Sequence, residues 1–217
     1  MSLRINDIAP DFTADTTEGP ISFHNWIGDG YAVLFSHPKD FTPVCTTELG
    51  MMAGMADQFA ARDAKIIGIL VDPVSDHQRW KHDIQSLTGN AVGYPMIGDP
   101  EMIVAKLYGM LPAEETRVDG RTPADNQTVR TVFIVGPDKK VKLNLTYPMT
   151  TGRNFDEILR ALDSIRLTAQ HQVATPAGWQ QGDDVIVTGA VTDEDALARF
   201  GGFDQKLPYL RTTKQPG

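Results

Sequence analysis

The chain contains one cysteine, Cys45, at the end of the segment Pro38-Lys39-Asp40-Phe41-Thr42-Pro43-Val44-Cys45. The apolar residues before this segment predict a short buried strand over residues 31–35, which Pro38 ends because it has no N–H for a ladder. Pro43 suits the first position of a helix, with Thr42 as its N-cap, so Cys45 is expected in the first turn. Free N–H groups and the helix dipole make that end positive, which favours the nucleophilic thiolate over the thiol.

A lone cysteine has a second common fate, as a buried and unreactive small side chain. Residue type alone favours this second interpretation of Cys45, and the position at a helix start beside Thr42 and Pro43 brings the reactive one level with it. The Thr42 hydroxyl, three residues earlier, can donate or accept a hydrogen bond near the sulfur. Judged on these residues alone, both interpretations stay open.

The segment Ser36-His37-Pro38 through Cys45, followed by Thr46-Thr47-Glu48-Leu49-Gly50, resembles the active-site segment of the peroxiredoxins, and in particular their 1-Cys, peroxiredoxin-6-like branch. Segments resembling the same family recur along the chain: Asp72-Pro73-Val74, Val129-Arg130-Thr131-Val132-Phe133, Tyr147-Pro148, Thr151-Gly152-Arg153-Asn154-Phe155-Asp156-Glu157, and Val173-Ala174-Thr175-Pro176 with Trp179. The resemblance therefore spans essentially the whole chain. It implies a thiol-dependent peroxidase that reduces hydrogen peroxide and organic hydroperoxides and serves antioxidant defence and redox homeostasis.

Arg130 is the second residue to which the resemblance gives a role. The resemblance implies that its guanidinium lies beside the Cys45 sulfur, lowers the thiol pKa and hydrogen-bonds the peroxide oxygens. Two structural alternatives exist: an ion pair with a carboxylate such as that of Glu48, or a solvent-facing position at the strand end. We expect the catalytic role, with Glu48 holding the arginine in place.

Three further residues complete the predicted site. Pro38 ends the strand, and the resemblance implies that it also shields the pocket from water. His37 is expected to contact the oxidised sulfur rather than to act as a base. Arg153 could neutralise a carboxylate at a helix start, but the resemblance places it as a second arginine near the site.

The expected reaction begins when the Cys45 thiolate attacks a peroxide oxygen in line with the O–O bond. Thr42, Arg130 and the Cys45 amide would stabilise the developing charge, and the sulfur would become a sulfenic acid. Without a second cysteine, neither the chain nor an identical partner can resolve that sulfenic acid as a disulfide. An external thiol or other reductant is therefore required, and over-oxidation is the expected hazard.

Two other function classes are alternatives to the peroxidase. Some peroxiredoxin-6-like proteins also carry phospholipase activity, from a serine in a Gly-Asp-Ser segment with a histidine and an aspartate. His24 and Asp138 stand at two of those positions, but Gly28-Asp29-Gly30 has no hydroxyl at the third, so that activity is not expected. The other alternative is a redox-switched holdase or peroxide-signalling protein that uses the same cysteine.

Composition limits the partners and the compartment. The 217 residues carry a net charge of −8, which argues against nucleic acid and anionic membranes as partners. The first residues have no apolar h-region, and no stretch has membrane-spanning length, so we expect a cytoplasmic protein. No metal or cofactor is expected, because His77, His82 and His171 lack metal-ligand spacing and are predicted to lie at the surface.

The predicted elements give an α/β fold with a mixed central sheet, which the resemblance narrows to a thioredoxin-like fold. Residues 46–62 show the apolar spacing of a single helix, and residues 65–71 form a nearly unbroken apolar run, the pattern of a strand covered on both faces. Two further strands over residues 129–135 and 141–147 form a hairpin, and Asn154 begins the last helix of the core. The predicted peroxidase domain comprises residues 1–169.

Residues 170–217 are predicted to form a small C-terminal α+β extension. One strand over residues 184–187 and one helix over residues 193–200 are expected, with too few apolar residues for an independent core. The extension should therefore pack either on the peroxidase domain of the same chain or on a partner subunit. The resemblance favours a homodimer, with the extension as an arm reaching the other subunit, and it leaves higher oligomers open.

Overall fold

The computed structural model describes residues 3–113 and 127–217 and divides the chain into two compact units, Met1–Arg153 and Asn154–Gly217. The helix that begins after Asn154 thus groups with the C-terminal elements, and the predicted domain boundary after residue 169 stays a prediction. Within the described residues, no helix combines the length and the apolar character needed to cross a bilayer.

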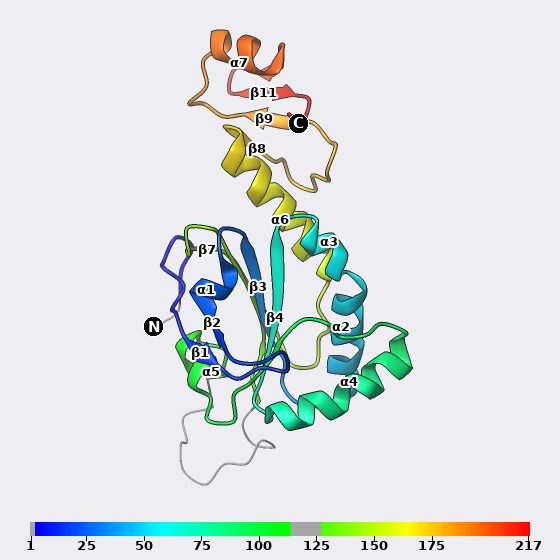
Figure 1. Cartoon of the computed structure of the whole chain (residues 1–217). Helices are drawn as coiled ribbons and strands as arrows, with labels where there is room; N and C mark the ends of the chain where they lie inside the picture. The colour runs from blue at the N-terminus through cyan, green and yellow to red at the C-terminus, as the bar shows by residue number, and fades with distance from the viewer. Residues whose placement is uncertain (1–2, 114–126) are drawn as a thin grey trace. The chain divides into compact units, whose positions relative to one another are not determined.

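A five-stranded mixed sheet forms the centre of the first unit (Figure 1). Its order is β5-β4-β3-β6-β7. The strands are β3 (Tyr31–Ser36), β4 (Ala64–Leu70), β5 (Met96–Gly98), β6 (Arg130–Val135) and β7 (Val141–Tyr147). β3 pairs parallel with β4 and β4 with β5, whereas β6 is antiparallel to both β3 and β7. The predicted mixed sheet and its closing hairpin are confirmed, and the fold is thioredoxin-like.

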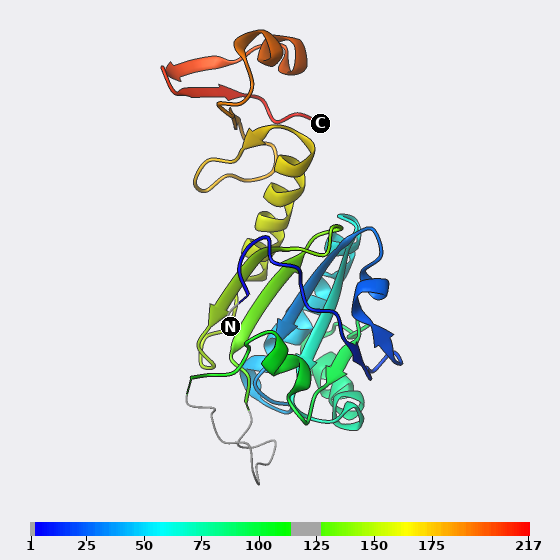
Figure 2. The ribbon, with the colours of Figure 1, turned by 90° about the vertical axis from the view of Figure 1, so that its left-hand side faces the viewer.

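Helices cover both faces of this sheet. Figures 1 and 2 together place α2 and α4 on one face and α1 and α5 on the other. The remaining elements of the unit are β1 (Thr13–Ala14), β2 (Ile21–Ser22), α1 (Phe23–Ile27), α2 (Pro43–Gly54), α3 (Ala56–Ala60), α4 (Val74–Thr88) and α5 (Ile103–Leu107). The prediction of one helix over residues 46–62 is wrong, because the segment breaks at Met55 into α2 and α3. Gly54 stands at the break, where a poor helix former makes the interruption less costly.

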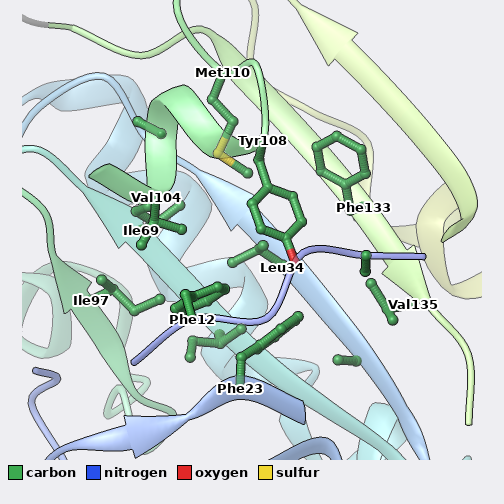
Figure 3. Packing of buried hydrophobic residues seen from close by; sticks show 14 of the residues in the cluster. Phe12, Phe23, Leu34, Ile69, Ile97, Val104, Tyr108, Met110, Phe133 and Val135 are labelled. Atoms are coloured by element: carbon green, nitrogen blue, oxygen red, sulfur yellow. The ribbon is translucent and has the colours of Figure 1, made fainter. Parts of the chain in front are cut away.

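Aromatic rings fill the core on the α1 and α5 face (Figure 3). The ring of Phe12 stacks on that of Phe23 at 4.7 Å, and the edge of Tyr108 meets Phe133 at 5.3 Å. The buried Tyr108 hydroxyl donates to the Pro10 carbonyl oxygen at 2.7 Å, so its polar end is satisfied. Side chains alternate along β3, so its other residues face α2. That second face carries the site described below.

The second unit consists of a helix, a small sheet and a further helix. Its sheet has the order β10-β11-β9-β8, and two small apolar clusters lie within the unit. The elements are α6 (Phe155–Gln170), β8 (Val173–Ala174), β9 (Val185–Val187), α7 (Asp193–Phe200), β10 (Asp204–Leu207) and β11 (Leu210–Thr213). The α7 prediction is confirmed. The prediction of a single strand is wrong, because β10 and β11 form a hairpin whose mostly polar residues lack strand alternation.

The close contact between α2 and α4 predicts that a side chain at position 50 lowers the stability of the fold. A Cβ added at Gly50 would lie 2.3 Å from Thr88 Cγ2 and 2.7 Å from Thr88 Cβ, on a side chain that is stiff at χ1. Gly50→Ala should therefore lower the free energy of unfolding by about 1–3 kcal/mol in urea denaturation. The matched control is Gly54→Ala, whose Cβ meets only the flexible end of Asn90 at 2.8 Å. Equal effects of the two substitutions would contradict this packing.

Candidate active site

The pairing of β3 with β6 brings two distant parts of the chain together. In this antiparallel pair Phe35 faces Val132, so His37, two residues beyond Phe35, comes level with Arg130 at the start of β6. The Thr128 hydroxyl donates to the His37 carbonyl oxygen at 2.7 Å and extends the contact beyond the strands. The sheet register therefore places His37 and Arg130 at one edge of the site.

The start of α2 supplies the sulfur to the same place. Thr42 is the N-cap and Pro43 the first helical residue, which puts Cys45 in the first turn as predicted. The Thr42 hydroxyl does not cap the helix; it donates to the Lys39 carbonyl oxygen at 2.9 Å. Glu48 follows Cys45 by three residues, so its carboxylate lies on the same side of the helix.

Arg130 connects the sulfur to the carboxylate. Its Nη1 lies 3.3 Å from Cys45 Sγ and donates to Glu48 Oε2 at 2.7 Å. Its Nε donates to the Met149 carbonyl oxygen at 2.7 Å. The side chains of Arg130, Cys45 and Glu48 are all buried, so the guanidinium does not face solvent. The ion pair with Glu48 and the position beside the sulfur, which are alternatives on sequence grounds alone, occur together.

A second guanidinium binds the other side of the same carboxylate. Arg153 Nε and Nη2 donate to Glu48 Oε1 and Oε2 at 3.1 and 2.8 Å, and the Arg153 backbone N–H donates to Oε1 at 2.7 Å. Arg153 Nη1 donates to the Thr131 carbonyl oxygen at 3.1 Å. His37 Nδ1 lies 3.3 Å from Glu48 Oε2. Glu48 thus binds both arginines and contacts the histidine. Arg153 grips both carboxylate oxygens in the fork geometry that guanidinium groups favour.

These neighbours set the charge of the sulfur. Burial raises the pKa of Cys45, but the hydrogen bond and charge of His37, the Thr42 hydroxyl and the Arg130 charge outweigh it and lower the pKa from 9.0 to about 6. Burial likewise raises the pKa of Glu48, while His37 and Arg153 hold it well below its usual range. At neutral pH the site therefore holds a thiolate and a carboxylate opposite two guanidinium groups.

The remaining predicted residues differ in their surroundings. Pro38 is buried two residues after the end of β3, and its shielding role stays a prediction. The prediction that His77 lies at the surface is wrong: it is fully buried and hydrogen-bonded, because α4 turns it toward the segment before α2. His82 is exposed and His171 half-buried. Within residues 3–113 and 127–217, no three His, Cys, Asp or Glu side chains gather as metal ligands would.

The three positions compared with a lipase-type site do not carry that chemistry. His24 Nε2 is hydrogen-bonded to the Ala9 carbonyl oxygen at 2.7 Å, and Asp138 pairs with Lys142 at 2.7 Å. Gly30 lacks the hydroxyl, and any Cβ there would lie 2.5 Å from the Asp63 carbonyl oxygen. A serine nucleophile is thus absent and would require the backbone to move.

Three groups that support the site had no signal in the sequence. The carbonyl groups of Met149 and Thr131 orient the two arginines, and any residue type supplies such a carbonyl. Tyr94, whose hydroxyl donates to the Leu49 carbonyl oxygen at 3.1 Å, packs its ring against that of Phe35. Only the fold brings these groups to the site.

Comparison with known proteins gives two family matches. The AhpC/TSA family model matches residues 5–144, and the model for the C-terminal domain of 1-Cys peroxiredoxin matches residues 164–202. The first match lies within the first unit and the second match within the second unit.

Similar individual proteins extend over nearly its full length. Peroxiredoxin-6 of Gallus gallus is 48% identical, over 99% of this chain and 98% of its own. The solved structure of the yeast mitochondrial 1-Cys peroxiredoxin has a TM-score of 0.90 at 46% identity, covering 98% of this chain and 99% of its own. A serine mutant of peroxiredoxin 6 from Arenicola marina has a TM-score of 0.91 at 45% identity, with 99% of each chain covered.

We expect the Glu48 carboxylate, which binds both Arg130 and Arg153, to be important for stability. Glu48→Gln keeps the shape but leaves two buried guanidinium groups without a counter-charge, so the free energy of unfolding should fall by about 3–5 kcal/mol in urea denaturation. Because the pKa of Glu48 is lowered on folding, its contribution is present at neutral pH and is lost as pH falls through the folded-state pKa. The variant should therefore lose less stability on acidification than the natural protein.

The matched control for this prediction is Glu18→Gln. Glu18 pairs with Lys81 at 2.6 Å, but its side chain is 48% exposed. Such a surface pair contributes less than about 1 kcal/mol. An effect of Glu48→Gln no larger than that of the control would show that Glu48 does not hold the two arginines together.

Proposed function

Because the chain belongs to the AhpC/TSA family and is a 1-Cys peroxiredoxin, a thiol-specific peroxidase, we propose that Cys45 is the sulfur that peroxide oxidises. Thr42 and Arg130 are the side chains that act on the peroxide oxygens, and Pro38 excludes water from the pocket. Glu48 and Arg153 position Arg130, and His37 contacts the sulfur before and after its oxidation.

One observation carries this assignment: the 3.3 Å contact between Arg130 Nη1 and Cys45 Sγ, made by a guanidinium that also binds Glu48. The Arg130 charge adds to the larger effects of His37 and Thr42, which together lower the pKa of Cys45 to about 6 and keep the sulfur anionic at neutral pH. The same fixed donors are well placed for the charge that develops on peroxide oxygens during attack. Because Glu48 holds Arg130 in place before substrate arrives, little reorganisation is needed in the transition state.

The reaction follows from these groups. The lone pair of the Cys45 thiolate attacks the terminal oxygen of ROOH, an S–O bond forms and the O–O bond breaks. The alkoxide or hydroxide that leaves takes a proton from solvent and departs as alcohol or water. The sulfur becomes a sulfenic acid, oxidised by two electrons, and further peroxide would take it to sulfinic and sulfonic acids.

The reductant must supply two thiols. The first thiol displaces hydroxide from the sulfenic acid to give a mixed disulfide and water, and the second releases Cys45 as a thiol. The yeast structure that matches this chain concerns a thiol resolving mechanism that works through glutathione and thioredoxin systems. Together with the absence of a second cysteine, this supports glutathione or a dithiol protein as the reductant here.

Two broader parts of the proposal concern assembly and compartment. We propose a homodimer, supported by apolar side chains that the second unit exposes: Leu207 is 44% and Tyr209 83% accessible. In the first unit, β7 is an edge strand of the sheet, where pairing with a second copy is possible.

A cytoplasmic location is supported by the dependence on a reducing partner for one unpaired thiol.

The peroxidase proposal predicts a stoichiometric burst. Without reductant, the reduced protein should consume one equivalent of hydrogen peroxide rapidly and then stop, as followed by stopped-flow fluorescence and peroxide assay. Arg130→Lys keeps the positive charge but loses the fork that binds Glu48 and the sulfur together, so the burst rate should fall about 100-fold at unchanged amplitude.

Cys45→Ser is the control for this experiment and should show no burst. A burst that survived in Cys45→Ser would assign the chemistry to another residue. An unchanged rate in Arg130→Lys would remove the arginine from the mechanism.

The assembly proposal predicts a mass twice that of one chain in light scattering after size-exclusion chromatography. Combining Leu207→Ser with Tyr209→Ser removes apolar surface of the second unit and should shift the equilibrium toward monomer. The matched control, Leu87→Ser, alters an α4 side chain that is 67% exposed and should leave the mass unchanged. A monomeric natural protein at micromolar concentration would contradict the proposal.

A further inference from the structure

The segment that joins β3 to α2 contains a strained residue. Phe41 has φ 53°, in the left-handed region that a residue with a Cβ enters only at an energetic penalty, and its side chain is 49% exposed. Its ring contacts that of the buried Trp80 on α4, with centroids 5.9 Å apart. A strained conformation persists only where neighbouring groups hold it. Because Thr42 directly follows Phe41, whatever holds this segment also positions Thr42 and the start of α2.

Asp40, the residue before Phe41, is attached to α4 by a buried hydrogen bond. His77 Nδ1 lies 2.6 Å from Asp40 Oδ2, and both side chains are at most 3% exposed. The Asp40 backbone N–H donates to Asp72 Oδ2 at 2.8 Å. His77 and Trp80 are three residues apart on α4, so one face of the helix holds two consecutive residues of the segment.

The proton of this bond can be placed from its partners. His77 Nε2 faces the Ile97 carbonyl oxygen at 3.1 Å, and a carbonyl only accepts, so Nε2 carries a hydrogen. The bond between Nδ1 and Oδ2 then needs one more proton, as imidazolium with carboxylate or as imidazole with carboxylic acid. In both forms the pair is neutral as a whole.

The surroundings make that proton necessary. Burial raises the pKa of Asp40, the nearby carboxylates of Asp72 and Asp76 raise it further, and His77 opposes them. The other oxygen, Asp40 Oδ1, is buried and has no hydrogen-bond partner within the described part of the chain. His77 thus provides the side-chain hydrogen bond to this carboxyl group, and without it a buried charge would be left uncompensated.

We propose that His77 is a positioning residue for peroxide reduction: through its one-proton hydrogen bond to Asp40 it holds the segment that carries Thr42 and leads into Cys45. This inference rests on the proposed role of Cys45 and Thr42. In this role His77 acts directly on neither the sulfur nor the peroxide. Its effect on the reaction passes through the backbone of residues 40–42.

A double-mutant comparison tests the proposal, with the peroxide burst rate and the thiolate pKa as readouts. In His77→Leu the Asp40 carboxylate loses its partner, so the rate should fall about ten-fold or more and the thiolate pKa should rise. In Asp40→Asn the amide can donate to Nδ1 of neutral His77, so the loss should be smaller. Adding Asp40→Asn to His77→Leu removes the unpaired charge and should restore part of the rate.

The spectroscopic readout is a downfield proton NMR signal from the Nδ1–Oδ2 bond, expected in the natural protein and absent in Asp40→Asn. It stays decisive if His77→Leu does not fold. The exposed-histidine control, His82→Leu on the same helix, should leave rate and signal unchanged.

Three results would overturn the inference: no downfield signal in the natural protein, a natural rate in His77→Leu, or a double variant slower than His77→Leu. Failure of the underlying function is a separate outcome, because the natural protein itself would then show no burst.

Discussion

The site depends on one buried carboxylate. Glu48 binds Arg130 and Arg153 at the same time, and both guanidinium groups are buried in the space behind Cys45. Without an anion between them, two such cations would repel each other and neither would remain desolvated. A buried ion cluster of this kind adds little net stability compared with apolar packing. Its value lies in fixing a positive group 3.3 Å from the sulfur before any substrate arrives.

The fold supplies the pieces of this cluster from separate parts of the chain. Parallel β3 ends where antiparallel β6 begins, which brings His37 beside Arg130. The segment after β3 leads into α2 and its Cys45–Glu48 turn, and the segment after β7 returns with Arg153. A mixed sheet is essential here, because only an antiparallel neighbour starts at the edge where β3 ends. Catalytic geometry is thereby tied to strand register.

The features of the site that could be predicted from the sequence are those that depend on side-chain type and on local rules such as helix starts. Pro43 after Thr42 marks a helix start, which places Cys45 in the first turn. The main-chain carbonyl groups that orient the arginines have no such signature. The burial of His77 was also beyond local reasoning, because α4 carries few apolar residues and its buried face becomes visible only in the fold. The hairpin of β10 and β11 lacks a sequence signal for a related reason: its first strand is exposed and mostly polar.

The central claim is that the fixed positive surroundings of Cys45 keep its sulfur anionic at neutral pH. The most direct test is a pH titration of the thiolate ultraviolet absorbance in the reduced protein, with Cys45→Ser as the blank. The account predicts a midpoint at about pH 6, whereas an unperturbed thiol would titrate with a pKa near 9.0. A midpoint close to that of an unperturbed thiol would contradict it.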